Sequence, residues 1–210
     1  MAAKYLIGVD EVGRGPLAGP VGLGVVAVAE ERAADFARLF DGVRDSKQLT
    51  AESRERWQAE AARQKAAGLI DYAVCMIGNE VIDSKGLSFA IRFALARALR
   101  RLDLDPSECR VFLDGGLKAP PEYARQETII KGDQKVQVIS LASIVAKVER
   151  DARMEALSRA HPGYGFEAHK GYGTAAHLEA IRAQGLCPIH RRSFLRGHIE
   201  VVDCEGVGVL

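Results

Sequence analysis

Two adjacent acidic residues near the start of the chain, Asp10 and Glu11, are the side chains best suited to chemistry. They follow a short apolar run, Tyr5–Val9, and precede a glycine-flanked arginine, Arg14. The apolar run is typical of a buried strand, so the pair would place two negative charges where a sheet meets its loops. Such a pair is stabilising only where a cation or an electropositive ligand offsets the repulsion. A hard divalent metal ion is the simplest candidate.

Two further acidic residues stand next to apolar runs later in the chain. Asp114 follows the run Val111–Leu113 and precedes two glycines, and Asp133 lies in a short charged segment before the run Val136–Ile139. A single Asp-Gly pair is also an ordinary turn signal. Three acidic sites at strand ends can, however, converge on one edge of a sheet. This expected convergence is what points to a functional site.

The donor chemistry of four carboxylates favours Mg²⁺ or Mn²⁺ over Zn²⁺, because hard cations prefer oxygen ligands. Two such ions, roughly 3.5–4 Å apart, can activate a water molecule and stabilise the departing oxygen during phosphodiester cleavage. No His-Glu-x-x-His spacing occurs among the histidines, which we expect to be surface or packing residues. The five histidines are His161, His169, His177, His190 and His198.

The four cysteines lie far apart in the sequence and form no Cys-x-x-Cys pair. This spacing favours reduced thiols in a cytosolic protein over a disulfide framework or a zinc site. They are Cys75, Cys109, Cys187 and Cys204.

The acidic residues need a sheet to hold them, and the hydrophobic pattern predicts one. Early strands followed by strands that alternate with helices indicate an α/β fold with a mixed sheet. The predicted strands are Tyr5–Val9, Val21–Ala29, Leu69–Ile77, Val111–Leu113 and Val136–Ile139. The predicted helices are one capped by Thr50 and running to about Ala67, a second over Ser88–Leu102, and a third from about Leu141 to Ala160.

The chain has 210 residues, of which 48% are hydrophobic and 27% charged. These values fit one globular domain over residues 1–210, with a helical C-terminal part from about residue 155. Near the N-terminus, the apolar run Val21–Ala29 is too short to cross a bilayer, and we expect neither a targeting leader nor a membrane anchor. We therefore expect a cytoplasmic protein. No oligomerisation signal is evident, so a monomer is expected.

The net charge of +1 gives no overall sign of a polyanionic partner. A nucleic-acid-binding protein can nevertheless carry its positive charge on one face. Several local basic clusters are present, and each by itself is interpreted as a solvated surface patch. They are Lys131 with Lys135, His169 with Lys170, and Arg191 with Arg192 and Arg196.

Six motifs, taken in order, closely resemble bacterial ribonuclease HII, a member of the type 2 ribonuclease H family. The resemblance covers nearly the whole chain. An isolated Asp-Glu pair would be weak support, but the ordered set is specific. The motifs are Asp10–Val21, Asp45–Leu49, Lys131–Asp133, Ala142–Val148, Pro162–His177 and Pro188–Phe194.

The resemblance implies a metal-dependent endoribonuclease with a ribonuclease H-like mixed sheet, flanking helices and a helical C-terminal part. Its substrates would be RNA–DNA hybrids, cut in the RNA strand, and DNA duplexes containing ribonucleotides, cut on the 5′ side of the ribonucleotide. Hydrolysis would leave a 3′-hydroxyl and a 5′-phosphate, as ribonucleotide excision repair requires. The resemblance assigns metal binding and catalysis to Asp10, Glu11, Asp114 and Asp133.

The resemblance also implies substrate contacts. The turn Gly13-Arg14-Gly15 would read the ribose 2′-hydroxyl and the adjacent phosphate, because missing side chains let backbone amides approach the sugar. An ordinary tight turn is the alternative interpretation. Tyr172 would pack against the sugar next to the ribonucleotide and help to select an RNA-to-DNA junction. Tyr164 is the competitor for this role.

Three more residues are candidate phosphate ligands. Ser143 and Lys147 are four residues apart in the third predicted helix, so they share a face and can present a donor and a cation. Lys47 is a similar candidate. Helix capping or simple solvent exposure remains the alternative for all three.

The sequence departs from the usual family pattern at three places. Val12 replaces the commoner alanine, Gly116 stands where asparagine is frequent, and Gln134–Ser140 contains fewer alanines and serines than usual. These departures leave the positioning of Asp114 and of the segment after Asp133 open, and they remove no carboxylate.

Three alternatives stay open at this stage. A ribonuclease HIII would be expected to have an additional N-terminal domain and a lysine in the glycine turn, where this chain has Arg14. A non-catalytic hybrid-binding module would tolerate loss of an acidic residue. A different two-metal nuclease or phosphatase would need neither the glycine turn nor Tyr172.

Overall fold

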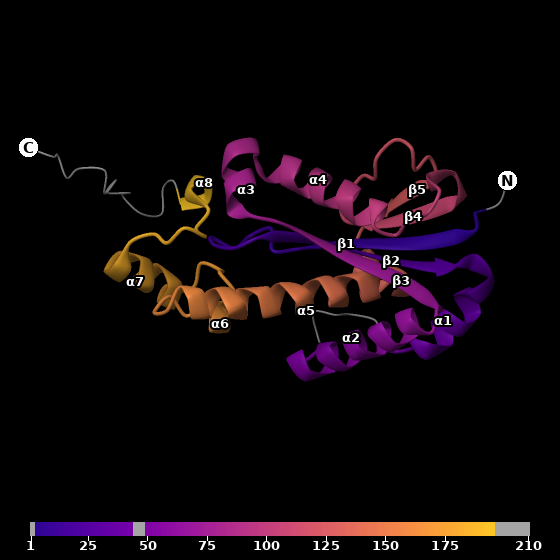
Figure 1. The fold of residues 1–210 in the computed structure, drawn as a ribbon, viewed down its shortest axis with the longest axis horizontal. Coiled ribbons are helices and arrows are strands. Elements are labelled where there is room, and N and C mark those ends of the chain that lie inside the picture. The colour runs from indigo at the N-terminus through magenta and orange to yellow at the C-terminus, as the bar shows by residue number, and fades with distance from the viewer. Residues whose placement is uncertain (1–2, 44–48, 196–210) are drawn as a thin grey trace, which may run out of the picture.

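A mixed five-stranded sheet forms the centre of the computed structural model, which describes residues 3–43 and 49–195 (Figure 1). The strand order is β3-β2-β1-β4-β5. β1 pairs antiparallel with β2, which pairs antiparallel with β3, whereas β1, β4 and β5 run parallel. The strands are β1 Tyr5–Val12, β2 Val21–Ala29, β3 Ile70–Ile77, β4 Cys109–Asp114 and β5 Gln126–Ile129.

Helices cover both faces of this sheet, as predicted. In Figure 1, α3 and α4 lie on one side, α5, α2 and α1 lie on the other, and α6 to α8 extend one end of the molecule. The helices are α1 Ala33–Leu39, α2 Ala51–Ala66, α3 Asn79–Lys85, α4 Leu87–Arg100, α5 Gln137–Ala160, α6 Phe166–His169, α7 Ala175–Gln184 and α8 Arg192–Leu195. Short 3₁₀ helices are η1 Glu30–Arg32, η2 Pro106–Glu108 and η3 Gly132–Gln134. The helical C-terminal part is confirmed.

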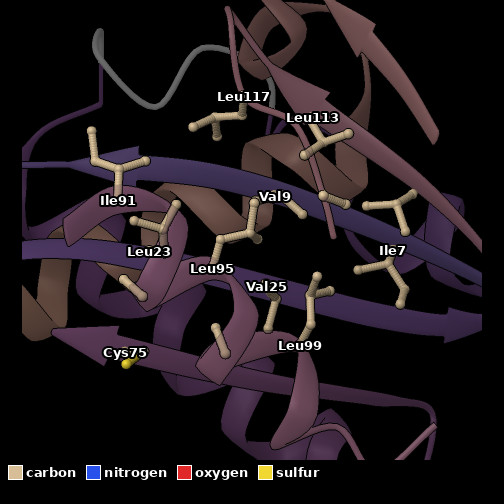
Figure 2. Packing of buried hydrophobic residues seen from close by; sticks show 14 of the residues in the cluster. Ile7, Val9, Leu23, Val25, Cys75, Ile91, Leu95, Leu99, Leu113 and Leu117 are labelled. Carbon is tan, nitrogen blue, oxygen red and sulfur yellow. The ribbon is translucent and has the colours of Figure 1, made fainter. Parts of the chain in front are cut away.

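The larger core lies between the sheet and α4 (Figure 2). On β1, Ile7 and Val9 are fully buried in this core, and α4 contributes residues at helical spacing. The α4 residues labelled in Figure 2 are Ile91, Leu95 and Leu99. Successive residues of a strand face opposite sides of the sheet. Gly8 and Asp10, on either side of Val9, therefore belong to the face opposite this core.

Two glycines on that opposite face let α5 pack directly on the sheet. A Cβ atom at Gly8 would lie 2.3 Å from the Val138 carbonyl carbon, and one at Gly24 would lie 2.4 Å from the Ala142 carbonyl oxygen. Such distances are far below van der Waals contact, so any side chain here would push the helix away. Asp10 shares this face with Gly8 and therefore meets α5 at close range.

Most elements predicted from the sequence are confirmed, although their ends move. The first predicted strand continues to Val12, so Asp10 and Glu11 lie within β1 rather than after it. Thr50 caps α2 as predicted, with its hydroxyl accepting the Ser53 backbone N–H. The three described cysteines, Cys75, Cys109 and Cys187, are free, and Cys204 lies outside the described residues. Within the described ranges, the structure contains no helix with the length and hydrophobicity of a membrane span.

The predicted strand Val136–Ile139 is wrong, because this segment begins α5. The Ile139 and Ser140 backbone N–H groups both donate to the Val136 carbonyl, which fixes a helical start. A four-residue apolar run does not distinguish a buried strand from a buried first helical turn. The fifth strand is instead β5, a short polar edge strand without an apolar run to reveal it.

Candidate active site

Three carboxylates meet at one edge of the sheet. The parallel pairing of β1 with β4 aligns Val9 with Leu113, so Asp10 and Asp114 follow at neighbouring positions. Asp133 completes the group, and one carboxylate oxygen from each of the three residues lies within 4.8 Å of the others. The expected convergence of the three acidic sites is therefore confirmed.

Asp133 reaches this cluster by a route that the sequence did not indicate. It lies in η3, between β5 and α5, rather than beside a strand, and its side chain is fully buried. Lys131 precedes this turn in the left-handed conformation, with a φ angle of 55°. The Gly132 backbone N–H donates to Asp114 Oδ1 at 2.7 Å, which ties the turn to the end of β4.

Glu11 lies beside this cluster and outside the group of three. Its Oε1 accepts a hydrogen bond from Arg14 Nη1 at 2.8 Å. Its Oε2 is buried and receives no hydrogen bond from the described residues. A buried carboxylate oxygen without a donor is costly, so this atom is suited to a cationic ligand.

The electrostatics of Asp10 also favour a cation. Burial, and to a smaller extent the negative charges of Asp114 and Glu11, raise the pKa of Asp10 to about 7. Hydrogen bonds from the Ser143 hydroxyl and from the Glu11 backbone N–H, at 2.7 Å, oppose this rise in pKa. A divalent cation would displace the proton and relieve the repulsion among the carboxylates. The residues present therefore fit a hard metal ion.

A cavity of about 420 Å³ opens in front of the acidic residues. It collects residues from β1 and the turn after it, α2, β4, α5 and the loop before α7. The lining residues are Asp10, Glu11, Val12, Gly13, Arg14, Gly15, Arg54, Asp114, Ser143, Lys147 and Tyr172.

The glycine turn in this cavity is held by a buried arginine, Arg191. Arg191 is fully buried, so its interpretation as part of a solvated basic patch is wrong. Its Nη2 and Nη1 donate to the carbonyls of Gly13 and Arg14 at 2.7 and 3.0 Å, and its Nε donates to Gly19 at 2.9 Å. Burial lowers the pKa of Arg191 to about 9, with a smaller contribution from the charge of Arg150.

A second buried arginine, Arg150 on α5, closes the space behind the turn. A Cβ at Gly13 would lie 2.1 Å from Arg150 Nε, and the φ angle of Gly13 is +80°. Only glycine fits this position without displacing Arg150. The turn is therefore tightly constrained, unlike an ordinary surface turn.

Tyr172, rather than Tyr164, faces the cavity. Its side chain lines the pocket and is 43% exposed. Tyr164 is 7% exposed, stacks on Phe166, and donates its hydroxyl to the Gly185 carbonyl at 2.9 Å. A side chain committed to these contacts cannot turn towards the cavity, so of the two tyrosines Tyr172 is the one placed to meet a ligand there.

The candidate phosphate ligands differ in their surroundings. Ser143 and Lys147 both line the cavity, which agrees with their shared helical face. Ser143 hydrogen-bonds Asp10, whereas Lys147 forms an ion pair with Asp151 at 2.8 Å. Lys47 lies outside the described residues. Arg54 on α2 also lines the cavity and was missed, because nothing in its helical sequence context distinguishes it from a solvated arginine.

Comparison with known sequences identifies the family. The family model described as Ribonuclease HII matches residues 7–197. A Ribonuclease HII from Nitrosococcus oceani is 46% identical over 191 residues, which cover 91% of this chain and 89% of the relative. A Ribonuclease HII from Caldicellulosiruptor bescii is 42% identical over 193 residues, covering 92% of this chain and 87% of the relative.

Solved structures with a similar fold point the same way. The ribonuclease H2 from Pyrococcus horikoshii is 27% identical, with a TM-score of 0.68 and coverage of 90% of this chain and 93% of that one. Bst-RNase HIII in complex with Mn²⁺ is 25% identical, with a TM-score of 0.62, and the match covers 88% of this chain and 64% of that one. With the family match spanning nearly the whole chain and the acidic cluster in the matching fold, the chain belongs to the ribonuclease HII family of metal-dependent endoribonucleases.

Proposed function

We propose that this chain hydrolyses the RNA strand of RNA–DNA hybrids and also cuts DNA duplexes on the 5′ side of an embedded ribonucleotide, leaving a 3′-hydroxyl and a 5′-phosphate. One observation carries the proposal. The acidic cluster of Asp10, Asp114 and Asp133 adjoins a cavity that also contains the Gly13-Arg14-Gly15 turn and Tyr172. The first group suits phosphodiester hydrolysis, and the second suits recognition of a ribose.

Asp10, Glu11, Asp114 and Asp133 are proposed to hold Mg²⁺ or Mn²⁺, with two ions in the substrate complex. The close approach of three carboxylates and the buried Oε2 of Glu11 support this assignment. When bound, two such ions supply an activated water molecule and stabilise the leaving oxygen. The Mn²⁺ complex of the ribonuclease HIII with the same fold supports the choice of metal.

The chain's own residues would orient the carboxylates. The Ser143 hydroxyl and the Glu11 backbone N–H hydrogen-bond Asp10 and favour its ionised form. The Gly132 N–H fixes one oxygen of Asp114 and leaves the other available. Each acid would then present a fixed oxygen to the cation, which lowers the reorganisation needed during the reaction.

The glycine turn is proposed to read the ribonucleotide. Arg191 binds the carbonyls of Gly13 and Arg14 from behind, so the opposite side of the turn remains available to a ligand. Backbone groups and Arg14 would contact the 2′-hydroxyl and the adjacent phosphate, the features that distinguish RNA at this position. The exposed ring of Tyr172 would pack against the neighbouring deoxyribose.

The remaining cavity cations, Lys147 and Arg54, are proposed to contact substrate phosphates, as is Lys47. Ser143 would contribute to the site through Asp10, in addition to its predicted role as a phosphate donor. Phosphate contacts release counterions, so binding should weaken steeply as salt increases. We further propose that the chain acts as a cytoplasmic monomer.

A non-catalytic hybrid-binding module is the alternative function. It would need the cavity and its cations but would have no use for a buried, mutually repelling set of acids, which costs stability unless it is used. The retention of all four acidic residues favours the nuclease.

The deciding experiment uses the purified chain with Mg²⁺ and, separately, with Mn²⁺. The substrates are a DNA duplex with one ribonucleotide, an RNA–DNA hybrid and an all-DNA duplex. A metal-dependent cut 5′ to the ribonucleotide, with the all-DNA duplex intact, is the expected result. Cleavage of the hybrid alone would overturn the ribonucleotide-in-DNA activity. Tight hybrid binding without any cut would favour the binding module.

A further inference from the structure

A pair of buried histidines lies behind the Tyr172 loop, outside the acidic site. His177 belongs to α7 and His190 precedes α8, and their exposed fractions are 0% and 1%. Their Nε2 atoms are 3.1 Å apart. Buried polar groups carry a cost unless each finds a partner, so the hydrogen bonds of this pair can be traced in full.

The hydrogen bonds fix a single direction through the pair. The Cys187 backbone N–H donates to His190 Nδ1 at 2.9 Å, and the Cys187 carbonyl oxygen and Sγ lie 3.1 and 3.2 Å from the same nitrogen. The Tyr172 carbonyl can only accept, so His177 Nδ1 carries a proton and His177 Nε2 is an acceptor. The His190 proton therefore lies on Nε2, and His190 Nδ1 accepts from the Cys187 N–H. That proton is donated to His177 Nε2. His177 Nδ1 in turn donates to the Tyr172 carbonyl at 2.9 Å. Both imidazoles are neutral, and both tautomers follow from the network.

The backbone of Tyr172 is consequently held on both sides. Its N–H donates to the His169 carbonyl at 2.9 Å, and its carbonyl accepts from His177 and from the Thr174 N–H, the latter at 2.8 Å. The next residue towards the N-terminus, Gly171, has a φ angle of +85°, and a Cβ there would lie 2.4 Å from the Ala18 carbonyl oxygen. The loop therefore has little freedom at the residue whose ring faces the cavity.

Aromatic packing keeps the two imidazoles in this arrangement. Phe166 is fully buried against both rings, with centroid distances of 5.3 Å to His177 and 5.7 Å to His190. His169 stacks on His177 at 4.5 Å. Burial lowers the pKa of His177, and it lowers the pKa of His190 to about 4. The titratable groups that face the pair are Tyr164, Cys187, His161 and His169.

We propose that His177 and His190 are positioning residues that fix the Tyr172 ring over the cavity, and thereby set the preference for a ribonucleotide followed by deoxyribonucleotides. This inference rests on the proposed substrate contact of Tyr172. His177 acts directly through the Tyr172 carbonyl, and His190 acts by holding the His177 tautomer that donates. Neither histidine touches the substrate.

The first test compares two substrates, because a general loss of folding would affect both. His177→Leu removes the donor to Tyr172, and we expect about tenfold slower cutting of the single-ribonucleotide duplex, the usual effect of losing one buried hydrogen bond. Cutting of a continuous RNA–DNA hybrid should change less than about twofold, because no junction has to be recognised there. His177→Asn, whose amide nitrogen can take the place of Nδ1, should restore most of the junction activity. Equal losses on both substrates, or no rescue by asparagine, would overturn the inference.

The second test is a double-mutant cycle with Tyr172→Ala. If His177 acts only through Tyr172, adding His177→Leu to Tyr172→Ala should leave junction cutting unchanged. Additive losses would contradict the inference. If His177→Leu fails to fold, His190→Asn replaces it in the same cycle, since asparagine can still accept the Cys187 N–H but cannot reach His177. Glu179→Gln, at an exposed position of the same helix α7, is the control and should leave both activities unchanged.

The two proposals can fail separately. A wild-type chain that leaves the single-ribonucleotide duplex intact overturns the proposed function. A wild-type chain that cuts this duplex while the His177 variants cut both substrates in the wild-type ratio overturns only the positioning role.

Discussion

Two groups of buried charge lie on either side of the Gly13-Arg14-Gly15 turn, and they are compensated in opposite ways. Behind the turn, Arg191 donates three hydrogen bonds to backbone carbonyls, and Arg150 donates to the carbonyls of Pro20 and Lys170. Of the nitrogen atoms of these two guanidinium groups, Arg150 Nη1 is the one buried without a partner among the described residues. In front of it, the acidic residues face one another. Their repulsion adds to the effect of burial in raising the pKa of Asp10.

This contrast distinguishes buried charges that hold the fold, the two arginines, from buried charges suited to a ligand, the acidic residues. A buried charge that the backbone satisfies contributes to one fixed conformation, and its loss leaves orphaned carbonyls. A buried charge surrounded by like charges lowers stability until a ligand arrives, and such strain is typical of functional sites. Substitutions in the two groups should therefore change activity and stability in different directions.

The largest expected effect is on catalysis. Asp133→Asn removes a proposed metal ligand while keeping the size of the side chain, and turnover on an RNA–DNA hybrid should fall by about 10³-fold or more. Hybrid binding, measured by fluorescence anisotropy, should remain within about threefold of wild type. Asp35→Asn, an exposed acid of α1, is the control and should retain full turnover. Unchanged turnover in Asp133→Asn would remove this residue from the mechanism.

The next effect tests the basic side of the turn. Arg191→Lys keeps the positive charge but cannot reach the carbonyls of Gly13, Arg14 and Gly19 together. We expect a loss of about 3 kcal/mol in the free energy of unfolding, since hydrogen bonds from a charged donor are lost in a buried site. Urea unfolding measures this loss. The control is Arg192→Lys at the neighbouring exposed arginine, which should lower the free energy of unfolding by less than about 0.5 kcal/mol. Similar losses for both variants would mean that Arg191 does not hold the turn.

Comparison of these two groups also explains what the sequence could predict. Asp10, Glu11 and Asp114 adjoin apolar runs of the sheet, so strand pattern alone brought them to one edge. Asp133 was found by resemblance and by its place before the apolar run Val136–Ile139, but its place in η3 depends on how α5 begins. The same ambiguity produced the wrong strand at Val136–Ile139.

Burial of polar residues was the part that the sequence could not reveal. Arg191 stands beside Arg192 in a polar segment, and only tertiary packing makes one buried and the other exposed. Tyr164 and Tyr172 likewise occupy similar glycine-rich contexts, and their different exposure comes from α7 and Phe166. The local sequence pattern predicts the helices and strands. Which arginine and which tyrosine is buried depends on contacts between residues far apart in the sequence.

A smaller effect concerns the histidine pair in acid. The folded pKa of His190 is about 4, below the unfolded value of about 6.5, so the unfolded chain binds the proton more readily. This contribution to stability is complete above about pH 6.5 and is lost as the pH falls through about 4. At pH 5 the loss should reach about 2 kcal/mol. Urea unfolding at pH 7.5 and at pH 5 measures this loss in the free energy of unfolding. His190→Asn should reduce the difference between the free energies of unfolding at the two pH values. An unchanged difference would show that His190 is not the titrating group.

The smallest effect has the opposite sign and is therefore the most informative about the acidic side. In the metal-free chain the folded pKa of Asp10 is raised, so its contribution to stability is present below about pH 4 and is lost as the pH rises through about 7. Asp10→Asn at pH 8 removes a buried like charge and should stabilise the metal-free chain by about 1 kcal/mol while abolishing turnover.

Thermal unfolding with and without Mn²⁺ provides the measurement for Asp10→Asn. Mn²⁺ should raise the unfolding temperature of the wild-type chain and should have little effect on the variant, because binding to the folded state alone stabilises it. Asp35→Asn should keep the wild-type response. If Asp10 serves to bind a cation, Asp10→Asn should abolish activity, stabilise the metal-free fold and remove the response to metal. Destabilisation by Asp10→Asn would instead place Asp10 with Arg191, among the charges that hold the fold.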